Sequence, residues 1–90
     1  MNKSEFVDAV AQNADIPKAT ASKAVDAVID VIGNELKRGE QVSLVGFGTF
    51  LTRNREARQG RNPRTGETIQ IKASRVPSFK AGKGLKDTVN

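Results

Sequence analysis

The stretch from Arg53 to Thr68 limits how this chain can fold more than any other feature, because almost nothing in it can pack against a core. Its only apolar side chains are Ala57 and Pro63, and arginines recur every two or three residues. The five arginines are Arg53, Arg55, Arg58, Arg61 and Arg64. We therefore expect this segment to project from the body and to present a row of guanidinium groups to a polyanion.

Length and composition leave little material for a core. The chain has 90 residues, four phenylalanines and no tryptophan or tyrosine. A chain this short buries only about 60% of the surface that its unfolded form exposes, and such domains usually add disulfides, a metal or oligomerisation. Because the sequence has no cysteine and no histidine, oligomerisation is the support that we expect, and no cofactor or metal is implied.

No targeting signal is visible in the sequence. Glu5 and Asp8 interrupt the first residues, which do not have the layout of a signal peptide. No run approaches the ~18 apolar residues of a membrane-spanning helix, and the lack of cysteine suits a reducing compartment. We expect a soluble, cytoplasmic protein with no membrane partner.

The positive charge lies in the second half of the sequence. Residues 1–52 contain five basic and seven acidic residues, a balance of −2, whereas residues 53–86 contain ten basic and two acidic residues, a balance of +8. Guanidinium groups suit phosphate and groove-edge contacts better than ammonium groups do. We therefore interpret the arginine-rich segment as a nucleic-acid contact rather than a solvated loop. A hairpin with two strands of about ten residues each would be ~30 Å long, which is enough to follow a duplex around its side.

The first part of the sequence predicts two helices. Asn2 and Glu5 have the spacing of a capping box. The Asp-Ile-Pro segment at 15–17 should end the first helix, because the residue before a proline is driven out of the helical region. A second helix should start near Pro17 or Lys18 and stop at Gly39. We expect residues 1–38 to form a helical dimerisation part.

The apolar face of the second helix is wide. At 100° per residue its apolar side chains span ~160°, which is more than the first helix can cover. We therefore expect this face to contact a partner subunit as well. The predicted dimer interface consists of Val28, Ile32, Leu36, Leu44, Phe47, Phe50 and Phe79.

The middle of the sequence predicts strands. Residues 42–44 alternate as a short strand, Gly46-Phe47-Gly48 forms a turn, and Thr49–Arg55 is a second strand. The return strand should run from Glu67 to Val76 and end at Pro77. These strands would form a three-stranded antiparallel sheet with a long β-hairpin.

A short helix is expected at the end of the chain, from Lys83 to Val89. The predicted fold class is therefore α+β, in a single domain of residues 1–90. Within it, residues 41–76 form the sheet and the nucleic-acid-binding hairpin, and residues 80–90 contain the C-terminal helix.

Two features each have a structural and a functional interpretation. Pro63 is either a turn former at a hairpin tip or a rigid apolar wedge that can enter between base pairs and kink a duplex. Lys80, Lys83 and Lys86 recur at intervals of three and form either a solvated surface or a second contact for the same polyanion. The chemistry of these residues leaves both choices open.

An enzymatic function has little support. The Gly46-Phe47-Gly48 motif lacks the third glycine of a dinucleotide fingerprint, since Leu51 stands there, and Gly82-Lys83-Gly84 lacks the Ser or Thr of a phosphate loop. Both are interpreted as structural turns. Without histidine, cysteine or tyrosine, no acid–base pair can be named, and we expect neither catalysis nor a small-molecule substrate.

Over essentially its whole length the sequence resembles the bacterial histone-like family of HU and IHF. The resemblance is carried by Gly46-Phe47-Gly48-Thr49-Phe50, by Arg55, Arg58, Gly60, Arg61, Asn62-Pro63 and Thr65-Gly66, and by Asn2-Lys3-Ser4 and Pro77-Ser78-Phe79-Lys80-Ala81-Gly82-Lys83. The ending at Asn90 is more similar to HU. Arg64 stands where HU chains often have glutamine, and a basic residue there is also similar to IHF.

The resemblance implies an intertwined homodimer, or a heterodimer with a paralogue, whose β-arms embrace double-stranded DNA. HU and IHF are themselves type examples of minor-groove architectural proteins. Binding in the minor groove is therefore implied by the resemblance. Pro63 would be the intercalating residue. The implied DNA-binding residues are Lys3, Arg53, Arg55, Arg58, Arg61, Asn62, Pro63, Arg64, Lys72, Arg75, Lys80, Lys83 and Lys86.

The sequence thus predicts a nucleoid protein that binds and bends double-stranded DNA without a cofactor. Few of its side chains suit bidentate base reading in the major groove, so we expect little sequence preference. Two alternatives stay open, namely a sequence-preferring subunit of the IHF type and a ribosomal or RNA-structural basic protein.

Overall fold

The computed structural model describes all residues from Met1 to Asn90, in two compact units. The first unit is Met1–Asn34 and the second is Glu35–Asn90. None of the helices combines the length and the apolar character needed to cross a membrane.

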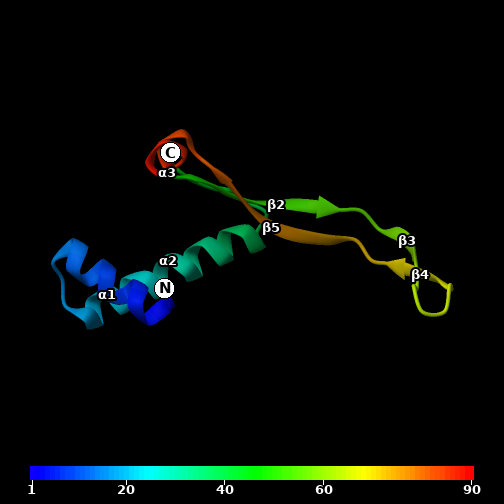
Figure 1. Cartoon of the computed structure of the whole chain (residues 1–90), viewed down its shortest axis with the longest axis horizontal. Coiled ribbons are helices and arrows are strands. Elements are labelled where there is room, and N and C mark those ends of the chain that lie inside the picture. Colours follow the sequence, from blue (N-terminus) through cyan, green and yellow to red (C-terminus); the bar gives the residue numbers. More distant parts are fainter. The chain divides into compact units, whose positions relative to one another are not determined.

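The first unit is a helical hairpin. α1 (Lys3–Ala14) begins after Asn2, whose side chain accepts a hydrogen bond from the Glu5 N–H at 2.9 Å, while the Glu5 carboxylate accepts one from the Asn2 N–H at 3.4 Å. The predicted capping box is confirmed. Asp15, with φ 54°, ends α1, and α2 (Lys18–Lys37) follows as predicted (Figure 1).

The core of the chain is very small and lies in this first unit. Val7, Ala21 and Val25 are the only buried apolar side chains. Val10, Ala11 and Ile16 pack around them and are partly buried. An exposed ion pair, in which the Lys18 ammonium lies 3.0 Å from the Asp8 carboxylate, also links α1 to α2.

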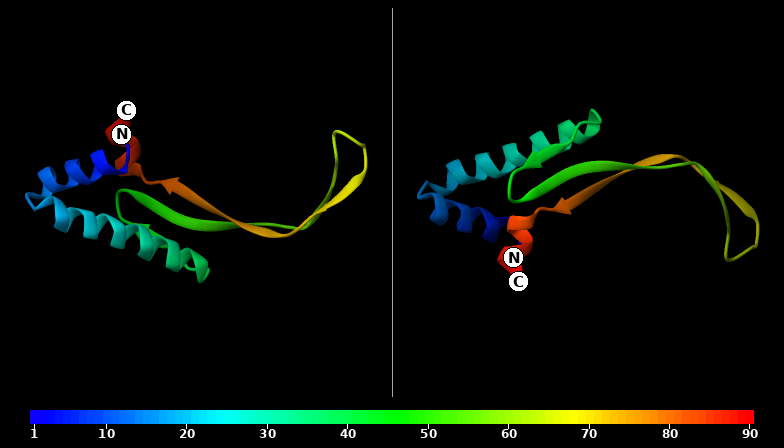
Figure 2. Two further views of the ribbon diagram at one scale, coloured as in Figure 1. Left: turned by 90° about the horizontal axis from the view of Figure 1, so that it is seen from below. Right: turned by 90° about the horizontal axis from the view of Figure 1, so that it is seen from above.

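The second unit contains two antiparallel sheets. β1 (Val42–Leu44), β2 (Gly48–Arg55) and β5 (Ser74–Ala81) form a three-stranded sheet in the order β1-β2-β5, and β3 (Arg58–Arg61) pairs with β4 (Thr68–Ile71). The predicted α+β class with a three-stranded sheet and a long hairpin is confirmed. We call β3, β4 and the residues between them the arm; Figures 1 and 2 show that β2 and β5 run side by side with a twist and lead into it.

The return strand differs from the prediction. A continuous strand from Glu67 to Val76 was expected, but the structure has β4 and β5 with Lys72 and Ala73 between them. The prediction that Pro77 ends the strand is wrong, because β5 continues through it to Ala81. β5 is an edge strand of its sheet, where a proline can stand with its missing N–H on the unpaired side.

The two glycine motifs contact each other. The Gly82 N–H donates to the Phe47 carbonyl at 2.8 Å, and the Leu85 N–H donates to the Gly46 carbonyl at 3.0 Å. α3 (Lys83–Val89) therefore starts directly on the turn that joins β1 to β2. The interpretation of Gly46-Phe47-Gly48 as a structural turn is confirmed. Gly82-Lys83-Gly84 is not a turn, because Gly82 is the N-cap of α3 and Lys83 and Gly84 begin that helix.

Much of the predicted dimer interface is exposed in the single chain. Val28, Leu44, Phe47 and Phe79 are 55%, 43%, 44% and 42% exposed, whereas Ile32, Leu36 and Phe50 are half-buried. The Phe79 ring packs between Phe47 and Phe50, with centroid distances of 5.4 Å and 4.7 Å. Exposure of so many large apolar side chains is typical of a contact surface, and the dimer stays a prediction.

The close packing of α3 on the glycine turn predicts a large difference between two substitutions. A Cβ at Gly84 would collide with the Gly46 carbonyl oxygen, whereas a Cβ at Gly33 in α2 would meet nothing within 4 Å. We expect Gly84→Ala to lower the free energy of unfolding by about 1–3 kcal/mol. The control Gly33→Ala should raise it by about 0.4–1 kcal/mol, because alanine restricts the unfolded chain.

Urea unfolding of the two variants and the parent chain, all at one protein concentration, measures this difference. Equal stability of Gly84→Ala and the parent would contradict the packing of α3 on the turn.

Candidate nucleic-acid interface

The arm carries arginines on both of its faces. Arg58 pairs with Ile71 and Arg61 pairs with Thr68. Residues opposite each other in an antiparallel ladder share a face, and successive residues alternate, so Arg58 and Arg61 point to opposite faces. The predicted guanidinium groups therefore follow the arm without forming a single row on one side.

The face of Arg58 also has an apolar patch. Gly60 pairs with Ile69, and a Cβ at Gly60 would come within 2.9 Å of the Ile71 side chain. The two isoleucines thus cover the glycine backbone. This patch stiffens a ladder that would otherwise consist of exposed polar side chains.

The tip of the arm is closed by its own hydrogen bonds. The Gly66 N–H donates to the Asn62 carbonyl, and the Asn62 N–H donates to the Glu67 carbonyl, both at 2.7 Å. The Asn62 side-chain oxygen accepts from the Arg64 N–H at 2.9 Å, which is an Asx-type turn. Pro63 lies in this turn and is exposed, so the tip presents the proline and Arg64 from a braced backbone.

The base of the arm adds further cations. Arg53 and Arg55 pair with Val76 and Ser74 and so share one face of the β2–β5 ribbon. Where the two sheets are interrupted there is a concavity of about 700 Å³. Its lining consists of Arg55, Glu56, Ala57, Arg58, Ile71, Lys72 and Ser74. Three positive groups and one carboxylate thus surround this concavity.

The arginines of the segment 53–68 have no protein partner. All five are exposed, and none makes a side-chain hydrogen bond or an ion pair. Charged groups that lack a partner within the protein keep their full attraction for an external anion. These five side chains are therefore the strongest candidates for contact with a polyanion.

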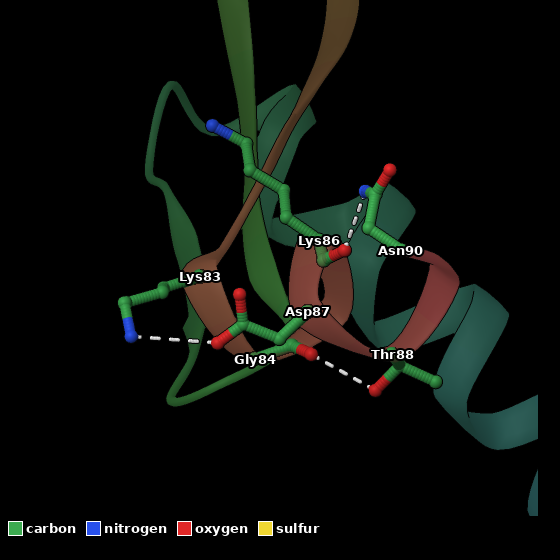
Figure 3. Close-up of polar contacts among 6 residues, drawn as sticks. All are labelled: Lys83, Gly84, Lys86, Asp87, Thr88 and Asn90. Carbon is green, nitrogen blue, oxygen red and sulfur yellow. Dashed lines mark hydrogen bonds and ion pairs between the residues drawn. The ribbon is translucent and has the colours of Figure 1, made fainter.

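The lysines near the C-terminus are arranged differently. Lys80 lies on β5 opposite Thr49, whereas Lys83 and Lys86 lie on α3. In Figure 3 the Lys83 ammonium turns toward Asp87, at 3.4 Å from its carboxylate, and the Lys86 side chain extends away from that pair. Lys86 is thus free to bind an anion, and Lys83 would have to leave Asp87.

Lys3 is also paired. Its ammonium lies 2.6 Å from the Asp26 carboxylate within the first unit. The hydrogen bond that the ammonium donates to Asp26 and the negative charge of Asp26 raise the pKa of Lys3 above its ordinary value. Desolvation opposes this shift, and the charge of Asp30 adds to it. Lys3 is therefore held positive, but its charge is already shared with a carboxylate.

Arg75 lies on β5, and its side chain has a partner within the protein. Its guanidinium donates from Nη2 to the Lys37 carbonyl oxygen at 3.0 Å. The sequence contains no local signal for this contact, because the two residues are 38 positions apart. The Lys83–Asp87 pair has the i,i+4 spacing of a helical ion pair and could have been read from the sequence.

Comparison with known proteins identifies related chains. The sequence matches the model of a family described as bacterial DNA-binding protein, over residues 1–90. It is 60% identical to the DNA-binding protein HU-beta of Pseudomonas aeruginosa and 57% identical to that of Escherichia coli strain K12, over 90 residues and the full length of each chain.

Two solved structures of HU proteins are also similar to this chain. The structure is similar to Anabaena HU in a cocrystal with DNA, with a TM-score of 0.90, 47% identity and coverage of 99% of this chain and 97% of that chain. It is also similar to HU from Thermotoga maritima, with a TM-score of 0.70, 31% identity and full coverage of both chains.

Proposed function

Because the chain belongs to the bacterial DNA-binding protein family, we propose that it is an architectural protein that binds and bends double-stranded DNA with little sequence preference. It acts in the nucleoid of the cytoplasm, without catalysis and without a cofactor. Its relatives include proteins named HU-beta, and the Anabaena HU was solved in a cocrystal with DNA.

The observation that carries this proposal is the set of five exposed arginines without any protein partner. Lysine and arginine side chains that neutralise phosphates release the counterions condensed on DNA, and this release drives binding without regard to sequence. The arm distributes its guanidinium groups over two faces, which suits contacts with both walls of a narrow groove. Sequence preference should be weak because few side chains could read base edges.

Pro63 is the proposed wedge. It is exposed in the turn at the tip of the arm, and HU and IHF are the type examples of minor-groove proteins that insert apolar side chains between base steps. Unstacking costs a few kcal/mol per step and is offset by contacts along the bent duplex. A turn former alone would contribute to binding but would not fix a kink.

The active form is proposed to be a dimer that folds residues 1–90 as one DNA-binding domain per chain. Only three apolar side chains are buried in the isolated chain, which is too little for a stable fold. The exposed apolar residues of α2 and of the three-stranded sheet provide the missing surface. The partner is a second copy or a paralogue.

The dimer proposal predicts that Phe47→Ala weakens folding and association together. The ring contacts Phe79 and is 44% exposed in the single chain, so its burial is completed only by a partner. We expect a loss of about 3–5 kcal/mol and a melting temperature that depends on concentration. Sedimentation velocity and thermal unfolding at two concentrations measure both effects.

Val89→Ala is the control for Phe47→Ala, because Val89 is 72% exposed at the chain end. It should leave stability and association unchanged. A folded, monomeric parent chain at micromolar concentration would contradict the dimer.

The phosphate contacts predict a specific salt dependence. Log affinity for duplex DNA should fall linearly with log salt concentration, and Arg61→Gln should reduce the slope by about one unit, since one phosphate contact is lost. Arg38→Gln removes the same charge outside the arm, from a side chain already paired with Glu35 at 3.1 Å, and should leave the slope unchanged. Binding isotherms at four salt concentrations provide the slopes.

A slope that is equally reduced in both variants would show that net charge, rather than the arm, binds the DNA. Higher affinity for duplex RNA than for duplex DNA of the same sequence would favour an RNA-binding function instead.

The wedge predicts that Pro63→Ala affects bending more than affinity. The variant should keep most of its affinity for linear duplex but lose bend angle and any preference for nicked DNA, where stacking is already weakened. Pro77→Ala, on the edge strand β5, is the matched control and should bend DNA normally. Fluorescence energy transfer between the ends of a short duplex at saturation measures the angle, and parental bending by Pro63→Ala would exclude the wedge.

A further inference from the structure

The carbonyl of Lys37, the last residue of α2, accepts no backbone hydrogen bond. The Glu40 N–H donates to the Glu35 carbonyl at 2.9 Å, and the Gly39 N–H donates to the Leu36 carbonyl at 3.0 Å. With Gly39 at φ 82°, these two bonds form a Schellman motif. The motif satisfies the carbonyls of Glu35 and Leu36 and leaves that of Lys37 without a local donor.

Arg75 of β5 supplies this donor. Its Nη2 lies 3.0 Å from the Lys37 carbonyl oxygen, and its Nη1 lies against the open side of Gly39, 3.9 Å from where a Cβ would stand. A cation at this place is favourable because the last carbonyls of a helix carry partial negative charge. Every other hydrogen bond between a side chain and the backbone joins residues no more than four positions apart.

The contact lies where the sheet loses its third strand. β1 supports β2 only as far as the pair Val42 and Phe50. Beyond that pair, β2 and β5 form a two-stranded ribbon, and isolated two-stranded ribbons are marginally stable in water. Arg75 pairs with Asn54 in this ribbon. The hydrogen bond from Arg75 to the Lys37 carbonyl therefore supports the ribbon beyond the end of β1.

We propose that Arg75 is a positioning residue that fixes the base of the arm to the end of α2. It stands on the strand face opposite that of Arg53 and Arg55, and it orders the ribbon from which these two arginines project. The sequence suggested that Arg75 contacts DNA directly, but its guanidinium is engaged within the protein. The effect of Arg75 on DNA binding rests on the proposed function, whereas its effect on the ribbon does not.

Hydrogen exchange in the DNA-free protein tests the positioning role by itself. In Arg75→Gln, the amides of residues 53–55 should exchange roughly 3- to 10-fold faster, the equilibrium effect of one lost hydrogen bond. Arg75→Lys keeps a charged donor beside the helix end and should restore most of the protection. Arg53→Gln, which removes the same charge from the neighbouring strand, should leave exchange unchanged.

DNA affinity as a function of salt separates positioning from phosphate contact. Arg75→Gln should weaken binding at every salt concentration with a nearly unchanged slope, whereas Arg53→Gln should reduce the slope by about one unit. Unchanged amide exchange in Arg75→Gln would overturn the proposal, as would a slope reduced by one unit together with normal exchange. If no variant and no parent chain binds DNA, the proposed function fails, and the exchange result still decides the role of Arg75.

Discussion

The pairing of β2 with β5 is the interaction on which the second unit depends. Its ladder extends from Gly48 and Ala81 to Arg55 and Ser74. At the first end it brings Gly82 and Leu85 to the carbonyls of the glycine turn, which fixes the start of α3. At the other end it delivers both chains of the hairpin to the arm. A slip of one residue would turn every side chain to the opposite face, so the placement of the arginines at the base of the arm is set by this register.

Local signals explain which parts of the fold could be predicted. The capping box at Asn2 and Glu5 and the stop at Gly39 involve partners within five residues, and all of them formed as expected. The failure at Pro77 has a different origin, because a proline ends a central strand but is tolerated on an edge strand. Only the strand order β1-β2-β5 decides which case applies. Nothing in the neighbouring residues carries that information.

The sequence could predict which charged residues form the candidate interface, but not which of them are already paired within the protein. The arginines of the segment 53–68 were correctly expected to be exposed, since that segment offers no apolar surface. The sequence could not show that Lys3 meets Asp26, or that Arg75 meets a backbone carbonyl, because both contacts depend on chain segments that only the fold brings together. Exposed ion pairs contribute only about 0–1 kcal/mol, so a phosphate can replace Asp26 or Asp87 at small cost. The unpaired arginines need no such exchange, and they should therefore dominate the encounter with a polyanion.

The arm has to be ordered by its own short-range contacts, because β3 and β4 pair only with each other. Asn62 closes the tip through its side chain and backbone, and Ile69 and Ile71 cover Gly60 in the ladder. The residues between β2 and β3 and between β4 and β5 have no ladder pairs, so order at the tip and order at the base are separate. Binding costs about 0.5–1.5 kcal/mol for each side chain that must be immobilised. A proline held in a braced turn has little freedom left to lose, and this makes Pro63 better suited to insertion between bases than a flexible apolar side chain at the same position.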